Sequence, residues 1–458
     1  MVFSSLIFLI IFLPVTLIGY FVLPKRCRNT VLLIASLVFY AWGEPIYVFL
    51  MILSILVNYV LGVDIGRSAG ARRTVLLIAA IIVDLLTLGF FKYYGFVVDT
   101  INGIFSLSLP VRELALPIGI SFYTFQILSY IIDVYRGRVE VQKNPLRFAL
   151  YVTMFPQLIA GPIVRYAQIE KELTDRIVTP ERVTRGAEIF LFGLAKKVLL
   201  ANTLGALFTS VQGADGRTAL TAWIGMTAYA LQIYFDFSGY SDMAIGLGHI
   251  FGFTFPQNFD HPYIAASITD FWRRWHMTLG GWFREYVYIP MGGNRVRPWR
   301  HVCNILVVWA LTGLWHGAAW NFVLWGLYYG VLLLLEKYLF RKVLDKCPAA
   351  IRHIYTLFFV MIGWVLFAAG GLSEAAGMLA DLFGRHGLAD LTAAYALRSY
   401  GLWIAAGILC ALPQTFSWYR RRTHDLPALT VLIGAALIFL CIASLVAGSY
   451  NPFLYFRF

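Results

Sequence analysis

The chain has 458 residues, of which 60% are hydrophobic and 13% are charged, and its formal net charge is +13. A soluble domain contains about 25% charged and about 45–50% apolar residues, so the composition predicts a polytopic membrane protein and excludes an ordinary soluble enzyme. The positive charge lies in short loops between apolar runs, which favours contact with anionic lipid over binding to nucleic acid.

Apolar runs follow one another along the whole chain, and a helix needs roughly 20 such residues to cross a bilayer. Gly43-Glu44-Pro45 interrupts one long run and predicts a tight hairpin there. Because several runs are short, we expect an all-α fold with about 10–12 transmembrane helices and some half-spanning, re-entrant or interfacial ones. The runs lie near residues 4–24, 31–43, 46–65, 74–98, 115–135, 147–163, 186–210, 219–254, 302–314, 317–340, 354–370, 400–416 and 427–448.

Basic loops predict the orientation of these helices. The first run lacks a basic n-region and a small-residue cleavage site, so we interpret it as a retained span rather than a signal peptide. Cytoplasmic loops are enriched in Lys and Arg, which predicts an extracytoplasmic N-terminus. The two loops that carry this prediction hold Lys25, Arg26 and Arg28, and then Arg67, Arg72 and Arg73.

No internal repeat is visible, and we expect one integral-membrane domain over residues 1–458. Its parts are N-terminal helices at 1–114, a motif-bearing core at 115–340 and C-terminal helices at 341–458. The five cysteines are scattered without a CxxC pair, and the chain has no Walker loop, no G-x-S-x-G and no HExxH. We therefore expect no bound metal or cofactor.

The segment 261–300 differs from the spans because six arginines stand there against two acidic residues. Its apolar residues fall at helical spacing, which predicts short helices that lie in the cytoplasmic interface or re-enter the bilayer. Such a segment can simply anchor the chain to anionic lipid. Arg273, Arg274 and Arg295 can also grip the phosphates of a coenzyme A or carrier-protein thioester. The apolar residues in question are Phe271, Trp275, Thr278, Trp282 and Tyr286.

Asp236 sits at apparent membrane depth, where a carboxylate costs roughly 2.5–3.5 kcal/mol on insertion scales. It should therefore be paired or face the protein interior. Tyr240 lies one helical turn away and is a local candidate partner. A structural hydrogen bond between helices and a catalytic role both remain open.

His316 stands alone in LTGLWHGAAWNFVLWGLYYG, residues 311–330, and an ionisable group inside a span is a hypothesis about function. A buried imidazole stays neutral and can take a proton from a hydroxyl. Trp315 and Trp320 could form the walls of a channel, with Trp320 one helical turn from the histidine. His276, also among rings and glycines, is the second candidate. From these residues alone, a catalytic and a packing role both remain open.

Several stretches then carry a family resemblance. They are MVFSSLIFLIIFLP at 1–14, LVFYAWGEP at 37–45, ALPIGISFYTFQILSYIIDVYRG at 115–137, FPQLIAGPIVRY at 155–166, FDFSGYSDMAIG at 235–246, DFWRRWHMTLGGWFREYVYIPMGGNR at 270–295, LTGLWHGAAWNFVLWG at 311–326 and FLYFRF at 453–458. Together they resemble the membrane-bound O-acyltransferase family, in its bacterial alginate-O-acetyltransferase-like branch.

The resemblance implies helices around a central tunnel, with an acyl thioester, acetyl-CoA or an acyl-carrier protein, entering from the cytoplasm. It implies that His316 is the essential histidine, acting as a general base, and that His276 is the second, upstream polar residue. The implied enzyme lies in the bacterial cytoplasmic membrane and O-acetylates an extracytoplasmic polysaccharide, beside an extracytoplasmic acetyltransferase partner. Transfer of D-alanyl groups from a carrier protein to teichoic acid is one alternative, and a polysaccharide transporter or flippase is another.

Overall fold

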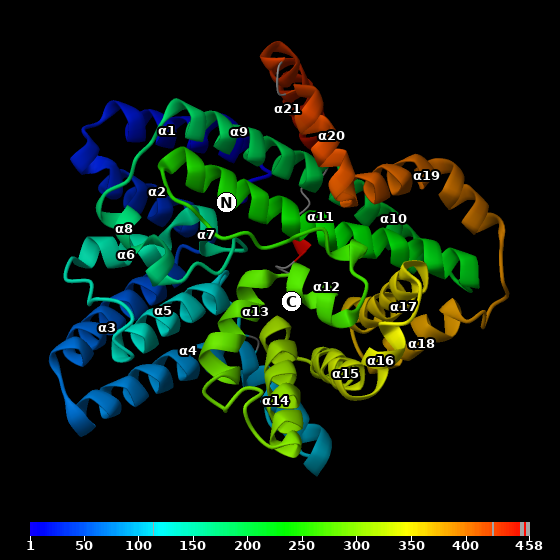
Figure 1. Ribbon diagram of the computed structural model, residues 1–458, viewed down its shortest axis with the longest axis horizontal. Coiled ribbons are helices and arrows are strands. Elements are labelled where there is room, and N and C mark those ends of the chain that lie inside the picture. The colour runs from blue at the N-terminus through cyan, green and yellow to red at the C-terminus, as the bar shows by residue number, and fades with distance from the viewer. Residues whose placement is uncertain (113, 424–425, 449–452, 455–458) are drawn as a thin grey trace. The chain divides into compact units, whose positions relative to one another are not determined.

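The computed structural model describes residues 1–112, 114–423, 426–448 and 453–454 (Figure 1). All regular elements in these residues are helices, which confirms the all-α prediction. The chain divides into two compact units. Unit 1 comprises 1–190 and 241–256, and unit 2 comprises 191–240 and 257–458. The single domain over 1–458 stays a prediction.

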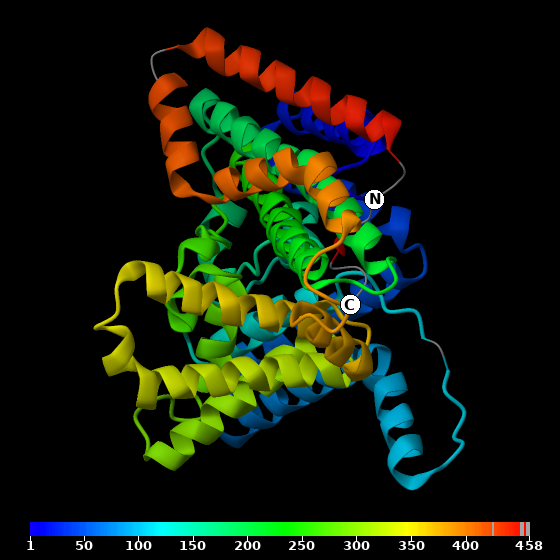
Figure 2. The same ribbon diagram turned by 90° about the vertical axis from the view of Figure 1, so that its right-hand side faces the viewer.

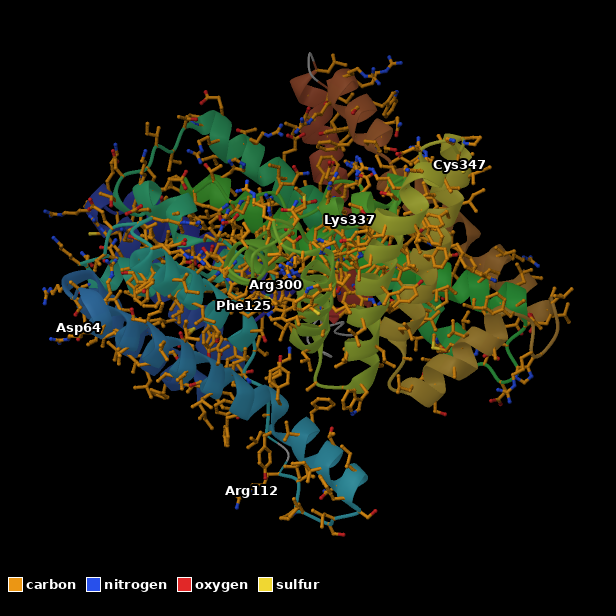
Figure 3. The ribbon with its side chains drawn as sticks, turned by 60° about the horizontal axis from the view of Figure 1, so that its bottom comes forward. Asp64, Arg112, Phe125, Arg300, Lys337 and Cys347 are labelled. Carbon is orange, nitrogen blue, oxygen red and sulfur yellow. The ribbon has the colours of Figure 1, made fainter. Side chains whose placement is uncertain are left out.

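Unit 1 is built around buried phenylalanines, including Phe3, Phe8, Phe39 and Phe155, whose rings lie 4.9–6.3 Å from one another. The segment 106–112 after α4 projects from the rest of this unit and holds Arg112 (Figure 3). The elements of unit 1 are η1 (Phe8–Phe12), α1 (Leu13–Val22), η2 (Lys25–Cys27), α2 (Arg28–Gly43), α3 (Tyr47–Arg67), α4 (Gly70–Phe105), α5 (Ile120–Tyr135), α6 (Pro145–Thr153), α7 (Phe155–Leu158), α8 (Tyr166–Thr174), most of α9 (Pro180–Ala195) and the end of α11 (Ala219–Phe251).

The structure confirms the hairpin at 43–45, because α2 ends at Gly43 and α3 begins at Tyr47. It corrects the run at 147–163. That run forms a nine-residue helix and one separate turn, α6 and α7, with Pro156 in the turn. The run at 115–135 becomes helical only from Ile120, and the resulting 16-residue helix is almost wholly buried. Both runs are apolar because they are covered by protein, so neither forms a full-length span.

Unit 2 has an aromatic core that includes Phe271, Trp325, Tyr329 and Trp364, all of them buried. Its α15 packs against α14 on one side and α17 on the other (Figure 2). Besides the rest of α9 and α11, its elements are η3 (Lys196–Ala201), α10 (Asn202–Gln212), η4 (Pro262–Ile264), α12 (Ile268–Arg274), α13 (Met277–Phe283), η5 (Arg284–Tyr288), α14 (Pro298–His316), α15 (Trp320–Leu335), η6 (Glu336–Phe340), α16 (Arg341–Leu344), α17 (Ala349–Ala368), α18 (Leu372–Leu382), α19 (Leu391–Ala411), α20 (Pro413–Thr423) and α21 (Pro427–Ala447).

Glycines set the close approach of α14 and α15. A Cβ at Gly326 would lie 3.0 Å from the carbonyl carbon of Trp309 and 3.1 Å from the amide nitrogen of Gly313. These are main-chain atoms and cannot turn aside. Small residues allow helix backbones to approach in this way inside membranes. The pairing holds the end of α14 at a defined distance from α15.

Seven helical segments of the described residues are long and apolar enough to cross a membrane, and the chain is a multi-pass membrane protein. Large apolar side chains on them are exposed, as on α21, where Val431, Leu432 and Phe439 are all more than half exposed. Lipid covers such surfaces in place of protein. The total of 10–12 crossings stays a prediction. The seven segments are Tyr47–Arg67, Gly70–Phe105, Pro180–Gln212, Trp320–Leu344, Ala349–Ala368, Leu391–Ala411 and Ala428–Ala447.

The segment 261–300 consists of short helices, as predicted, but its apolar residues do not form one stripe. The chain leaves the helical conformation at Trp275 and His276, between α12 and α13. Helical spacing therefore does not continue from Phe271 to Tyr286. Both of those side chains, with Trp275 and Trp282 between them, are buried.

Candidate active site

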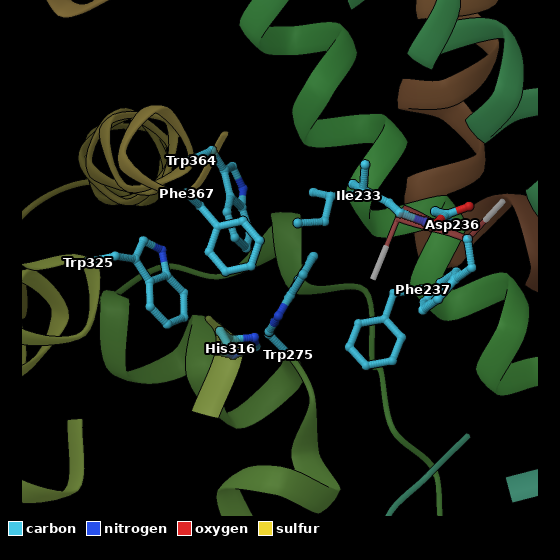
Figure 4. A pocket seen from close by; sticks show the side chains of 10 residues that line it. Ile233, Asp236, Phe237, Trp275, His316, Trp325, Trp364 and Phe367 are labelled. Atoms are coloured by element: carbon cyan, nitrogen blue, oxygen red, sulfur yellow. Dashed lines mark hydrogen bonds between the residues drawn. The ribbon is translucent and has the colours of Figure 1, made fainter. Parts of the chain in front are cut away.

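His316 is the last residue of α14 and is only 4% exposed. Three rings surround it. Its ring centroid lies 5.0 Å from those of Trp315 and Trp325 and 5.3 Å from that of Phe367. Figure 4 shows the histidine at the helix end, with the α15 and α17 aromatics on one side and Trp275 on the other. The helix ends here, and a Cβ on the next residue, Gly317, would collide with the ring of Phe322.

Two cavities of unit 2 meet at His316 and Trp275. The larger has a volume of about 160 Å³, and the smaller has about 20 Å³. A cavity needs about 10–15 Å³ to hold one water molecule. The small cavity therefore admits one small group beside the imidazole, whereas the large one admits an extended chain.

The larger cavity is an elongated slot along one face of α14. Ile305, Val308, Thr312 and His316 line it. At 1.5 Å per residue, the first and last of these lie about 16 Å apart along the helix. The lining also includes Arg284, which is exposed, so the slot leads from the surface to His316.

His276 lies on the wall of the same slot, in the break between α12 and α13, and is 2% exposed. Its φ of 45° is in the left-handed region, which costs a non-glycine residue about 1–2 kcal/mol. Its Nδ1 lies 3.1 Å from Oδ1 of Asn258. Burial lowers the pKa of His276 to about 3, so the ring is neutral at physiological pH. Strained residues of this kind cluster at functional sites.

Of the two tryptophans predicted as channel walls, Trp315 lies beside His316 but lines neither cavity. Its indole ring lies 5.7 Å from the ring of His276 and contacts His316 as well, so it bridges the two histidines. Trp320 is not one helical turn from His316, because α14 ends at the histidine and Trp320 begins α15. It is 50% exposed and lines neither cavity. Trp325 takes the position expected of Trp320.

The arginines of segment 261–300 divide into three groups. Arg274 is held by Asp270 and Asp260, at 3.0 and 3.2 Å, so its guanidinium is engaged within the protein. Arg273 and Arg295 are exposed and line neither cavity. Among the described residues, Arg284 is the only arginine in the lining of the larger slot. The sequence indicates a basic segment, but only the structure identifies which arginine faces the slot.

Asp236 lines the smaller cavity, and its carboxylate is ion-paired with Lys197 of the π-helical turn η3. Both residues are buried, at 1% and 4% exposure. The second carboxylate oxygen accepts a hydrogen bond from the main-chain N–H of Leu454, at 2.6 Å. These partners come from distant segments and not from Tyr240, the local candidate. The sequence analysis did not single out Lys197, although a lysine within an apolar run indicates a buried, paired charge.

A short segment near the C-terminus, residues 453–454, reaches the same place. Phe453 and Leu454, the first residues of FLYFRF, line the smaller cavity, while residues 455–458 lie outside the described part of the chain. Among the described residues, no three His, Cys, Asp or Glu side chains lie together as metal ligands would. The groups that line the two cavities are therefore two histidines, several aromatic rings and the carboxylate of one buried ion pair.

The model of the membrane-bound O-acyltransferase family matches residues 139–373, which include both histidines and most of the lining of both cavities. The chain belongs to this family. It is 39% identical over 503 residues to a probable alginate O-acetylase of Azotobacter vinelandii, and the match covers 100% of both chains. It is 43% identical over 391 residues to that of Pseudomonas aeruginosa, covering 84% of this chain and 75% of the relative.

A third relative of this O-acyltransferase is a peptidoglycan O-acetyltransferase of Helicobacter pylori, 36% identical over 427 residues, with 85% of this chain and 81% of the relative covered. The family assignment made from the sequence motifs is thus confirmed. For a membrane-bound O-acyltransferase, a slot that ends at a buried imidazole can bring a hydroxyl and an activated acyl group together.

Proposed function

We propose that this O-acyltransferase O-acetylates an extracytoplasmic polysaccharide, with a cytoplasmic thioester as the acetyl donor and His316 as the general base. The observation that carries the proposal is that His316 lies where the two cavities of unit 2 meet. Relatives that cover most of the chain are named as O-acetylases of alginate or peptidoglycan, which supports a polysaccharide as the acceptor.

In the proposed reaction, the imidazole of His316 removes the proton of an acceptor hydroxyl as its oxygen attacks the thioester carbonyl. A C–O bond forms, the C–S bond breaks, and the imidazolium returns the proton to the leaving thiolate. No covalent enzyme intermediate is needed. His276, on the wall of the same slot, orients or stabilises the reacting groups. Proton transfer by one positioned histidine accelerates such reactions by about 10²–10⁴-fold.

The length of the larger slot supports a thioester on a pantetheine arm. That arm contains the equivalent of about four residues of chain between its phosphate and its sulfur, so it reaches roughly 14 Å when extended. The slot runs for about 16 Å along α14. A donor with its sulfur at His316 would bring its phosphate to the outer end. Arg284, in the lining of this slot, is the cation that would bind the phosphate, since arginine binds phosphate in a bidentate manner.

The smaller cavity supports acetyl over D-alanyl as the transferred group. Its volume of about 20 Å³, bounded by Trp325, Trp364 and Phe367, suits a methyl group. A D-alanyl group would bring an ammonium into this apolar space. The one carboxylate in the described lining, that of Asp236, is already neutralised by Lys197. A second cation would therefore be buried without a charge partner, which is costly.

We place the protein in the bacterial cytoplasmic membrane with an extracytoplasmic N-terminus. We propose that an extracytoplasmic acetyltransferase works beside it and completes the transfer to the polymer. The basic loops support this orientation, since it puts them in the cytoplasm. Arg284, in the lining of the donor slot, belongs to the basic segment 261–300, which by the same rule favours a slot that opens to cytoplasmic thioesters.

The test is the ester content of the surface polysaccharide, measured by NMR in cells that express wild type or His316→Ala at matched membrane levels. We expect the variant to abolish the O-acetyl signal while polymer export persists. His386→Ala is the matched control, since this histidine is 43% exposed at its side chain and lies outside both cavities. Unchanged esters in His316→Ala would refute the mechanism. Loss of polymer export would support a transporter, and a D-alanyl ester would support the teichoic acid alternative.

A further inference from the structure

We propose that Asn258 is a positioning residue that holds His276 in a single tautomer, with the proton on Nδ1 and the Nε2 lone pair available to the reacting groups. The inference rests on the proposed function only for its consequence in catalysis. The tautomer itself follows from the hydrogen bonds around the Asn258 side chain. Asn258 lies between α11 and η4, is 1% exposed, and belongs to none of the motifs that carry the family resemblance.

The amide oxygen of Asn258 is identified by its donors. It accepts hydrogen bonds from the main-chain N–H of Thr278, at 3.3 Å, and from the Thr278 hydroxyl, at 2.8 Å. A main-chain N–H can only donate, so the side-chain atom that it contacts is the oxygen and not the amide nitrogen. The same oxygen lies 3.1 Å from Nδ1 of His276. The imidazole must therefore donate from Nδ1, and a neutral ring then has no proton on Nε2.

Asn258 also holds the strained main chain of the histidine. Its own carbonyl oxygen accepts from the N–H of Met277 at 2.9 Å, and the carbonyl of His276 accepts from Leu279 and Gly280 at 3.1 Å. The left-handed φ of His276 persists because the carbonyl of His276 and the N–H of Met277, the two main-chain groups that follow it, are both hydrogen-bonded. One asparagine thus determines both where the ring lies and which nitrogen carries its proton.

The other ring nitrogen, Nε2, belongs to a ring that lines the larger slot. It is buried and has no hydrogen-bond partner among the described residues, while His276 lines the larger slot with His316 and Arg284. The ring packs against Phe237, Phe259 and Trp315. Asp236, next to Phe237 in the chain, is paired with Lys197. Nε2 can therefore accept a hydrogen bond from a hydroxyl or thiol in the slot.

An amide at position 258 achieves something that a carboxylate would not. A carboxylate hydrogen-bonded to Nδ1 selects the same tautomer but also stabilises the imidazolium, which raises the pKa of the histidine. Asparagine selects the tautomer and leaves the ring neutral. His276 is then a hydrogen-bond acceptor throughout the physiological pH range, and it complements a separate base at His316.

The experiment compares Asn258→Leu, Asn258→Asp and Thr278→Val in the full-length protein labelled with ¹⁵N-histidine, whose nitrogen shifts distinguish bare from protonated nitrogens. A His276→Gln spectrum identifies the signals of His276. In wild type we expect a protonated Nδ1 and a bare Nε2. Asn258→Leu should redistribute the proton to Nε2, and Asn258→Asp should keep the tautomer and raise the pH at which the ring titrates. Thr278→Val, which removes only the second donor to the same oxygen, should leave the tautomer unchanged.

The ester content of the polysaccharide forms a second, independent measurement. Asn258→Leu should lower it at least tenfold at matched membrane levels, and Asn258→Asp should restore most of it. A wild-type ring with its proton on Nε2, or an Asn258→Leu protein that keeps the wild-type tautomer, would overturn the inference. The expected tautomers without any O-acetyl ester in wild-type cells would instead refute the proposed function and leave the role of Asn258 in place.

Discussion

Gly326→Ala provides a direct test of how the packing of α14 against α15 controls the site. The added Cβ would lie 3.0 Å from the carbonyl carbon of Trp309 and 3.1 Å from the amide nitrogen of Gly313, and nearer still to the carbonyl oxygen of Trp309. Favourable contacts between carbon atoms begin near 3.5 Å, so the two helices must separate by about 0.5 Å or more. His316, at the end of α14, would move relative to Trp325 on α15.

Two effects on stability compete. Alanine gains about 1 kcal/mol over glycine in a helix, whereas overpacking costs about 1–3 kcal/mol. The overpacking prevails because the obstructing atoms belong to the main chain and cannot change rotamer. We expect a net loss of about 1 kcal/mol. Because misplacing a catalytic group by about 1 Å can cost 10²-fold in rate, we also expect at least a tenfold loss of ester formation.

The assay combines thermal unfolding of the purified protein in detergent, followed by tryptophan fluorescence, with the ester content of the polysaccharide in cells. Gly401→Ala in α19 is the matched control, because a Cβ there meets nothing within 4 Å. The control should keep full activity and wild-type or slightly higher stability. If Gly326→Ala behaves like Gly401→Ala in both measurements, the close approach of α14 and α15 does not position His316.

Three further outcomes follow from the contacts described above. Lys197→Met should lower the free energy of unfolding by about 3 kcal/mol, because it leaves the buried Asp236 carboxylate without its charge partner. The double variant with Asp236→Asn should recover most of that loss in denaturation measurements, and additive losses would contradict a buried ion pair. Arg284→Ala should raise the donor concentration needed for half-maximal transfer about tenfold in membrane assays with acetyl-CoA, whereas Arg300→Ala, exposed and outside the slot lining, should not. The pKa of His276 is about 3 in the folded protein against an ordinary 6.5, so the unfolded chain binds the proton first as pH falls. Stability present above about pH 6.5 should decline by up to about 1.4 kcal/mol per pH unit below it, and His276→Gln should reduce that slope in melting curves.

The membrane class and the family were predictable from the sequence, because they depend on composition and on short contiguous motifs. The same motifs singled out both histidines, which the structure brings to one slot. One stretch carries His276 beside its arginines, and another carries His316 between Gly313 and Gly317. Such motifs remain recognisable whatever the rest of the chain does. The hairpin at 43–45 was predictable for the same reason, since a Gly-Glu-Pro interruption acts locally.

Predictions that assumed an uninterrupted helix did not hold. Trp320 was expected one turn from His316, but the chain leaves the helix at Gly317, so Trp325 stands beside the imidazole instead. The run at 147–163 is as apolar as a membrane span because it is buried inside the protein. Burial in protein and contact with lipid favour the same apolar residues, so composition alone does not distinguish the two.

The sequence by itself therefore determined the family and the class of reaction, O-acyl transfer, through short motifs in an apolar, basic chain. Only the tertiary structure decided which other groups serve that chemistry. Asn258 reaches His276 across 18 residues, and Lys197 reaches Asp236 from another helix. Arg284 is selected from six similar arginines by facing the slot. The physical reason is that hydrogen bonds, ion pairs and cavities depend on distances in space, and residues separated along the chain acquire those distances only when it folds.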